Sequence, residues 1–162
     1  MKNLIKISVL LFIVSLTTNN CFAQHSDIDK KELINDMLNS QKFVFVPEYV
    51  SPMAGQGRVL TSPYSLEITK DTVKADMPYF GVAYTAPINP ENAGIYFTST
   101  KFNYDMSNGK QGRKEISIKT KDVHNARTIF LTVFSNGKAT LNVTDQNRQP
   151  ISFNGYIKEI QD

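Results

Sequence analysis

Residues with catalytic or metal-binding chemistry are few and scattered in this chain of 162 residues. It contains two histidines, His25 and His124, and one cysteine, Cys21. Neither histidine has a second ligand at metal-binding spacing, and a zinc site without cysteine needs histidine together with carboxylates. The sequence contains no Gly-x-Ser-x-Gly elbow, no phosphate-binding glycine loop and no dinucleotide fingerprint. We therefore expect no metal and no cofactor.

Paired carboxylates are the remaining route to catalysis. Glycoside hydrolysis needs two acids that face each other roughly 5 to 10 Å apart. Glu67 with Asp76, or Asp71 with Asp105, could meet in this way once the strands pair, but acids in turns are mostly solvated. The pattern favours a protein without catalysis and leaves a carboxylate-dependent hydrolase as the alternative.

The most distinctive stretch of the chain is Asp76–Pro87, which reads DMPYFGVAYTAP. Proline biases the residue before it toward extended backbone, so this stretch predicts a bend followed by a strand. Side chains alternate across a strand, which places Phe80, Val82 and Tyr84 on a bulky face expected in the core. The opposite face is nearly bare beyond Tyr79, so another backbone or a ligand fits closely there.

Two interpretations of this bare face stay open: a glycine needed for tight packing, or the floor of a ligand groove. Tyrosine suits both, because it buries a ring and keeps its hydroxyl at a rim. The groove interpretation gives the candidate ligand-binding residues, in which Arg58 is a possible anion contact. They are Tyr79, Gly81, Ala83, Tyr96 and Arg58.

The elements that must position these residues begin after a predicted targeting segment, residues 1–23. Lys2 and Lys6 form a positive start, and Ile7–Leu16 is an apolar run too short to span a bilayer comfortably. The features are typical of a bacterial export signal cleaved after Ala23. They predict a periplasmic or secreted protein with no membrane span once the signal is removed.

Cys21 would leave with this segment, so the exported chain would have no thiol and no disulfide. The alternative is a lipoprotein acylated at Cys21, although Asn20 stands where a small residue is usual. Loss of Lys2 and Lys6 lowers the net charge from +3 to +1. With no basic patch of domain size, we expect no nucleic-acid partner.

Residues 24–162 are predicted to form a single β domain with one N-terminal helix, at about 26–40. Ser26 or Asp27 is a suitable N-cap, and the apolar residues that follow gather on one side. From about residue 42 the apolar period changes from 3.6 to 2. The predicted strands are Lys42–Val50, Arg58–Leu60, Tyr64–Ile68, Thr72–Met77, Tyr79–Tyr84, Gly94–Tyr104, Lys114–Thr120, Thr128–Phe134, Lys138–Thr144 and Pro150–Ile160.

Short turns join these strands, and Asn136-Gly137 is a strong hairpin signal. Pro47 indicates an edge position or a bulge in its strand, and the apolar Thr128–Phe134 indicates a strand covered on both faces. The chain therefore predicts an all-β, mainly antiparallel fold. It is a β-sandwich or partly closed β-barrel of about nine strands, with one N-terminal helix.

Several segments of the chain occur in the order found in a known family. They are the N-terminal helix, FVFVPEYVSPMAGQGRVL (Phe43–Leu60), a strand that contains Tyr64, MPYFGVAYTAP (Met77–Pro87), GIYF (Gly94–Phe97), SNGKATLNV (Ser135–Val143) and ISFNGYI (Ile151–Ile157). In this order of motifs the chain resembles DUF4251, a domain-of-unknown-function family of exported Gram-negative bacterial proteins. The resemblance implies an exported globular β protein and brings no activity, cofactor or catalytic residue.

Three functions remain open on these observations. The first is a non-catalytic periplasmic binding or accessory module for a small or extended ligand, working as a monomer or weak dimer with an unknown ligand or envelope protein. The second is the carboxylate-dependent hydrolase. The third is an interaction protein that pairs a partner strand with the Pro47 strand by β-augmentation.

Overall fold

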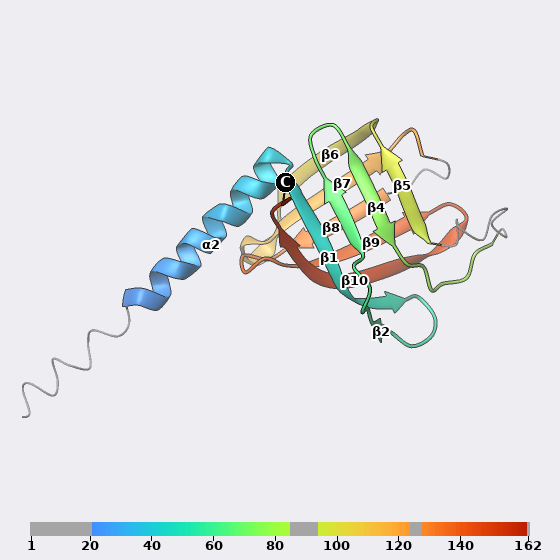
Figure 1. The fold of residues 1–162 in the computed structure, drawn as a ribbon, viewed down its shortest axis with the longest axis horizontal. Helices are drawn as coiled ribbons and strands as arrows, with labels where there is room; N and C mark the ends of the chain where they lie inside the picture. The colour runs from blue at the N-terminus through green and yellow to red at the C-terminus, as the bar shows by residue number, and fades with distance from the viewer. Residues whose placement is uncertain (1–20, 85–93, 124–127, 162) are drawn as a thin grey trace, which may run out of the picture.

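The computed structural model of the chain describes residues 21–84, 94–123 and 128–161, and shows one α-helix followed by ten strands (Figure 1). The short 3-10 helix Lys110–Gly112 lies between the sixth and seventh strands. The elements are α2 (Cys21–Ser40), β1 (Phe43–Pro52), β2 (Arg58–Val59), β3 (Ser65–Ile68), β4 (Val73–Met77), β5 (Ile95–Ser99), β6 (Phe102–Asn108), β7 (Lys114–Thr120), β8 (Thr128–Val133), β9 (Lys138–Asp145) and β10 (Arg148–Lys158).

The strands form a single antiparallel sheet that curls into a nearly closed barrel. Nine of them follow the order β5-β4-β3-β1-β10-β9-β8-β7-β6, and β2 pairs with β1 beside that path. The two end strands, β5 and β6, follow each other in the chain and diverge from their shared turn (Figure 1). This arrangement confirms the predicted all-β antiparallel fold with one helix.

The core lies inside the curled sheet because each strand points every second side chain inward. Partners such as Ile118 and Ile129, or Leu141 and Phe153, face each other across neighbouring strands. Full burial of a side chain of this size contributes roughly 1.5–3 kcal/mol relative to an exposed one. The largest fully buried side chains are Phe43, Phe45, Phe153, Leu38, Leu66, Ile68, Met77, Ile116, Ile118, Ile129, Leu131 and Leu141.

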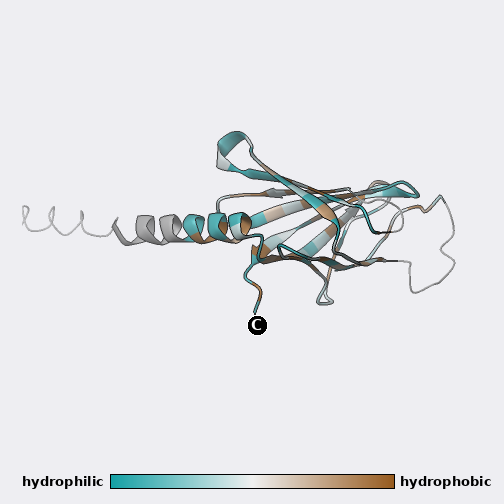
Figure 2. Cartoon of the chain, turned by 90° about the horizontal axis from the view of Figure 1, so that it is seen from above, coloured by the Kyte–Doolittle hydropathy of each residue, from teal (hydrophilic) through white to brown (hydrophobic). Residues whose placement is uncertain are grey.

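Helix α2 closes one end of the barrel with its last turns only. Ile34, Met37 and Leu38 are buried, whereas Leu33 is 46% exposed. The earlier turns of the helix project away from the sheet (Figure 1), and Figure 2 shows the last turns beside the strands. The predicted end at Ser40 is confirmed, but the helix begins at Cys21 rather than near Ser26 and so extends across the expected cleavage position.

The end of α2 is fixed by backbone and side-chain hydrogen bonds. Gln41 has a φ of 53°, and the amides of Gln41 and Lys42 donate to the carbonyls of Leu38 and Met37 at 3.3 and 3.1 Å. This is a Schellman arrangement with glutamine at the left-handed position that glycine usually occupies. Tyr104 of β6 also donates its hydroxyl to the Leu38 carbonyl at 3.2 Å, so the helix end is tied to the far edge of the sheet.

The predicted strand Tyr79–Tyr84 is wrong. The segment forms no ladder and contributes only an isolated bridge between Ala83 and Arg148. Val82 and Tyr84, expected in the core, are 54% and 67% exposed. The Tyr79 side chain folds back over Gly81 and occupies the position where a Cβ on Gly81 would stand. This contact, rather than strand pairing, determines the conformation of the segment.

The predicted long strand Gly94–Tyr104 is also wrong, because it is divided into β5 and β6 where the chain bends at Thr100 and Lys101. Their amides donate to the carboxylate of Asp122 at 2.9 and 3.1 Å, and the Ser99 hydroxyl donates to the same carboxylate. These bonds, led by that from Ser99, lower the pKa of Asp122 from 3.8 to about 2. Asp122, an acid in the connection after β7, thus holds the bend between β5 and β6 in place.

Of the two possibilities predicted for Pro47, an edge position or a bulge, the structure confirms the bulge. The edge position is wrong, because β1 lies between β3 and β10, and Pro47 marks the start of the β-bulge. The bulge shifts the register between Pro47 and Tyr49, which turns Tyr49 outward and Val50 into the core. In a regular strand, alternation of the side chains would place Tyr49 on the same face as Phe45.

The prediction that β8 is covered on both faces is wrong as well. Its burial alternates, with Ile129, Leu131 and Val133 inside, and Phe130 on the outer face is 44% exposed. The sheet is antiparallel here, so one face meets solvent, as is common for such sheets.

Candidate ligand-binding surface at the barrel end

The segment that contains Tyr79 seals the barrel end opposite α2. Tyr84 donates its amide to the Asn147 carbonyl at 2.8 Å, and Gln149 donates its amide to the Val82 carbonyl at 3.1 Å. The hydroxyl of Tyr79 lies 2.9 Å from the Val82 carbonyl and 3.0 Å from that of Gln149. The segment is therefore held against the turn between β9 and β10 by backbone groups that a strand would otherwise use.

Arg148, the first residue of β10, connects three parts of the candidate surface. Its guanidinium donates to the Gly94 carbonyl at 2.8 Å and lies 5.1 Å from the centre of the Tyr79 ring. The backbone of Arg148 bridges Ala83. The ring of Tyr96 packs against Gly94, at the position where a Cβ on Gly94 would stand. Arg148 thus contacts Tyr79 and Ala83 directly and reaches Tyr96 through Gly94.

Arg58 reaches the same segment from β2. Its guanidinium lies 4.3 Å from the centre of the Phe80 ring. A cation placed over an aromatic face within about 6 Å is attracted by the ring quadrupole, by about 0.5–1 kcal/mol where solvent reaches the pair. Tyr79 and Phe80 are consecutive, and each ring thus has an arginine guanidinium beside it. Arg148 lies at Tyr79 and Arg58 at Phe80.

The residues predicted from the sequence are partly brought together. Tyr79, Gly81 and Ala83 lie in one segment, and Tyr96 joins them through Arg148, while Arg58 contacts Phe80 rather than Tyr79. Gly81 does not form an open floor because the Tyr79 ring covers it. Sequence reasoning missed Arg148 and Phe80, since a turn of sequence DQNRQ gives no sign of what lies above it.

Two tyrosines of this surface have raised pKa values. Burial raises the pKa of Tyr79 above 10.0, and the nearby Arg148 opposes that rise. Burial also raises the pKa of Tyr96, with a further contribution from Tyr64 and Asp76. Both hydroxyls therefore stay protonated at neutral pH and act as neutral hydrogen-bonding groups.

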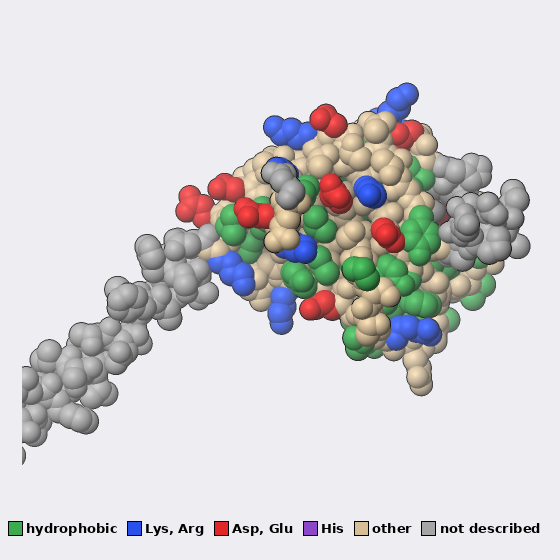
Figure 3. Space-filling model, in the orientation of Figure 1, with side chains coloured by type: hydrophobic (Ala, Val, Ile, Leu, Met, Phe, Trp, Pro, Cys, Tyr) green, Lys and Arg blue, Asp and Glu red, His purple; other side chains and the backbone are tan. Residues whose placement is uncertain are grey.

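Exposed apolar side chains gather near this end of the sheet. Figure 3 shows hydrophobic side chains clustered over the half of the molecule that carries β2. Contiguous exposed apolar surface of this kind marks interaction sites more often than isolated residues do. The strongly exposed examples in β2, the β1–β2 loop and the Tyr79 segment are Met53 (70%), Val59 (70%), Val82 (54%) and Tyr84 (67%).

Grooves also lie elsewhere on the described surface. The outer face of β1, β10 and β9 holds a groove of about 580 Å³ that includes Tyr49 and Phe134. It adjoins a second, of about 920 Å³, between α2 and β10, and the two share Glu48, Asn136 and Lys138. Both volumes fall in the range of ligand clefts, about 300–1,000 Å³.

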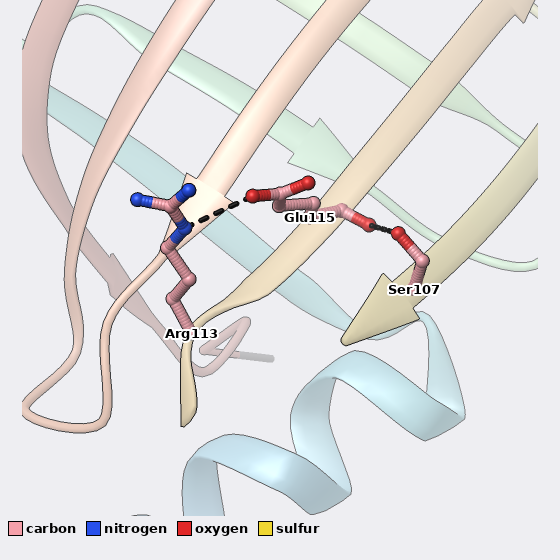
Figure 4. Close-up of polar contacts among 3 residues, drawn as sticks. All are labelled: Ser107, Arg113 and Glu115. Carbon is pink, nitrogen blue, oxygen red and sulfur yellow. Dashed lines mark hydrogen bonds and ion pairs between the residues drawn. The ribbon is translucent and has the colours of Figure 1, made fainter. Parts of the chain in front are cut away.

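The acids considered for catalysis do not form a clear pair. Glu67 faces Lys74 and Asp76 faces Tyr96 on the outer sides of their strands. A third groove, of about 290 Å³ on β6–β8, contains Asp105 and Glu115. Glu115 is engaged there, because Arg113 Nε donates to its carboxylate at 2.9 Å, and the Ser107 hydroxyl lies 3.4 Å from its carbonyl (Figure 4).

Metal and membrane features are absent from the described part of the chain. No cluster of three histidine, cysteine or acidic residues that could hold a metal forms among residues 21–84, 94–123 and 128–161; His124 lies outside these ranges. Within the same ranges, no helix combines the length and apolar character needed to cross a bilayer.

The fold and this surface define a helix-capped, nearly closed antiparallel β domain. The family model described as Domain of unknown function (DUF4251) matches residues 25–157. The chain belongs to this family, as its motifs had suggested.

A solved structure shares the architecture. The crystal structure of a DUF4251 family protein from Bacteroides eggerthii DSM 20697 has 19% sequence identity and a TM-score of 0.61, covering 84% of this chain and 91% of that chain. At this identity the likeness concerns the fold alone. No curated protein matches the chain significantly.

Proposed function

We propose that the chain is an exported, non-catalytic binding module of the bacterial envelope, whose ligand contacts the barrel end opposite α2. The observation that carries this is the pair of arginine–aromatic stacks, Arg58 on Phe80 at 4.3 Å and Arg148 on Tyr79 at 5.1 Å. Export rests on the leader, with its basic start, short apolar run and cleavage position after Ala23. Acylation at Cys21 is the alternative.

Stacked guanidinium groups suit recognition for a physical reason. Arginine presents a planar set of donors that matches a carboxylate or phosphate, and the contact of Arg58 with the Phe80 ring at 4.3 Å restricts its side chain before a ligand binds. The exposed Val82 and Tyr84 next to these rings offer apolar contact area. The surface therefore suits a small or extended ligand, free or part of an envelope protein, that presents an acidic group beside apolar atoms.

The proposal is tested on protein recovered from the periplasm, whose mass should correspond to a chain that starts at Gln24. Melting temperature is measured against panels of lipids, peptides and small anions, because a ligand that binds only the folded state raises it. Arg58→Ala should abolish the shift given by the ligand. Arg113→Ala is the matched control, since Arg113 pairs with Glu115 at the β6–β7 hairpin.

An unchanged melting temperature across the panels would count against the proposal. A shift that survives Arg58→Ala and responds to Arg113→Ala would place the ligand elsewhere. Turnover of a ligand by the purified protein would instead favour the hydrolase.

A further inference from the structure

The outer face of β1, β10 and β9 carries a groove built by the bulge in β1. The bulge makes Glu48 and Tyr49 consecutive outward residues, and bulges often re-aim side chains in this way beside binding sites. It forms opposite Gly155, where an added Cβ would collide with the backbone carbonyl oxygen of Val46. The Tyr49 ring is held in place over Gly57 and remains 38% exposed.

The groove combines two aromatic walls with a polar floor. Tyr49, Asn154 and Thr140 are direct neighbours across β1, β10 and β9, and Phe134 at the end of β8 closes the other side. Phe134 is 41% exposed. Aromatic side chains in this position offer large flat apolar faces at low entropy cost.

The polar groups of the floor are oriented as donors. Thr140 donates its hydroxyl to Asn154 Oδ1 at 3.0 Å, and the Lys138 amide donates to Asn136 Oδ1 at 3.0 Å. Each carboxamide oxygen thereby accepts a hydrogen bond, which leaves the Nδ2 group of each asparagine as the donor of its side chain. Glu48 supplies acceptors on the β1 side.

The charges of the groove cancel. Glu48 and Lys138 are its charged lining residues among the described part of the chain. An ionic ligand would find no net attraction here, whereas a neutral ligand with many hydroxyl groups could donate to Glu48 and accept from both asparagines.

We propose that this groove binds a neutral carbohydrate, with the apolar faces of its sugar rings against Tyr49 and Phe134 and its hydroxyls bonded to Asn136, Asn154 and Glu48. The volume of about 580 Å³ suits a short oligosaccharide, and the shared residues with the neighbouring groove allow a longer chain to continue toward α2. The groove is separate from the barrel end, so this inference does not depend on that surface.

The test is calorimetric titration of the purified full domain with maltotriose, cellotriose, xylotriose and triacetylchitotriose, and with an acidic trisaccharide for comparison. At least one neutral sugar should bind with a dissociation constant on the order of 0.1–1 mM. The double variant Asn136→Asp/Asn154→Asp keeps both Oδ1 acceptors and therefore the Thr140 and Lys138 bonds, but loses the Nδ2 donors. It should bind at least about tenfold more weakly.

Phe134→Ala should weaken binding as well, and Phe130→Ala is the matched control, because Phe130 is a similarly exposed phenylalanine (44%) on the outer face of β8 that does not line this groove. No binding of any neutral sugar at about 10 mM, or wild-type binding by a folded double variant, would overturn the proposal. Preferential binding of the acidic sugar would overturn it too. If Arg58→Ala did not affect a ligand at the barrel end, the proposed function would fail, but the carbohydrate titrations of the outer groove would keep their meaning.

Discussion

Gly155→Ala should destabilise the protein more than any ordinary surface change, because the added methyl has nowhere to go. It would overlap the Val46 carbonyl oxygen and stand 2.9 Å from both the Val46 carbonyl carbon and the Pro47 Cα. These are backbone atoms of the neighbouring strand, so no side chain can swing aside. β1 and β10 would have to separate at the bulge, where the register already shifts between Pro47 and Tyr49.

The cost follows from two contributions. Forcing one extra carbon into a packed site costs about 1–3 kcal/mol, and weakening the ladder bonds beside it adds roughly 1 kcal/mol for each bond lost. We expect about 3 kcal/mol of lost unfolding free energy, which corresponds to a melting temperature lowered by about 10 °C for a domain of this length.

Urea denaturation followed by circular dichroism measures this loss, with the slope of the transition unchanged if the fold is kept. Gly112→Asn is the control: Gly112 has a φ of 71° with no atom near its Cβ position, and asparagine tolerates that conformation. It should cost less than about 1 kcal/mol. If Gly155→Ala melted within about 2 °C of wild type, the close approach of the two strands would be refuted.

Two further changes test the turn at Asp122 and the end of α2. The lowered pKa of Asp122, about 2 against an ordinary 3.8, means that its bonds stabilise the fold above pH 4 and that this stabilisation is lost as the pH falls through 2. Asp122→Asn should therefore lower the melting temperature at pH 7 and flatten its acid dependence. An equal drop at pH 2 and pH 7 would contradict this. Gln41→Gly should stabilise the protein by up to about 1 kcal/mol, because glycine adopts the φ of 53° without strain. Gln111→Ala, an exposed change at a φ of 58°, is the comparison. A lower melting temperature for Gln41→Gly would contradict this account of the helix end.

Elements governed by local chemistry were predictable from the sequence. The bounds expected for Lys114–Thr120 are those of β7, and the Asn136-Gly137 signal gives the turn between β8 and β9. There Gly137 has a φ of 84° and donates to the Phe134 carbonyl at 2.9 Å. Every interaction that decides these elements lies within a few residues or follows from alternation.

The errors arise where distant residues decide the local structure. The Tyr79 segment became irregular because its hydroxyl and backbone bond to residues about seventy positions later. The turn after Ser99 depends on Asp122, which is 23 residues away. For the candidate site, Tyr79 and Tyr96 were predicted as tyrosines that can bury a ring and keep the hydroxyl at a rim, whereas Arg148 was missed because only the folded chain brings it to Tyr79.

The bulge in β1 connects the fold to both kinds of surface. Phe45 and Pro47 face the core, so a regular strand would have turned Tyr49 inward and Val50 outward. The extra residue reverses this alternation, which seals the core with Val50 and delivers Tyr49 to the outer groove. The same second half of β1 pairs with β2 and thereby carries Arg58 to Phe80 at the barrel end. Since Gly155 permits the bulge, a side chain at this one position should disturb the outer groove and the barrel end together.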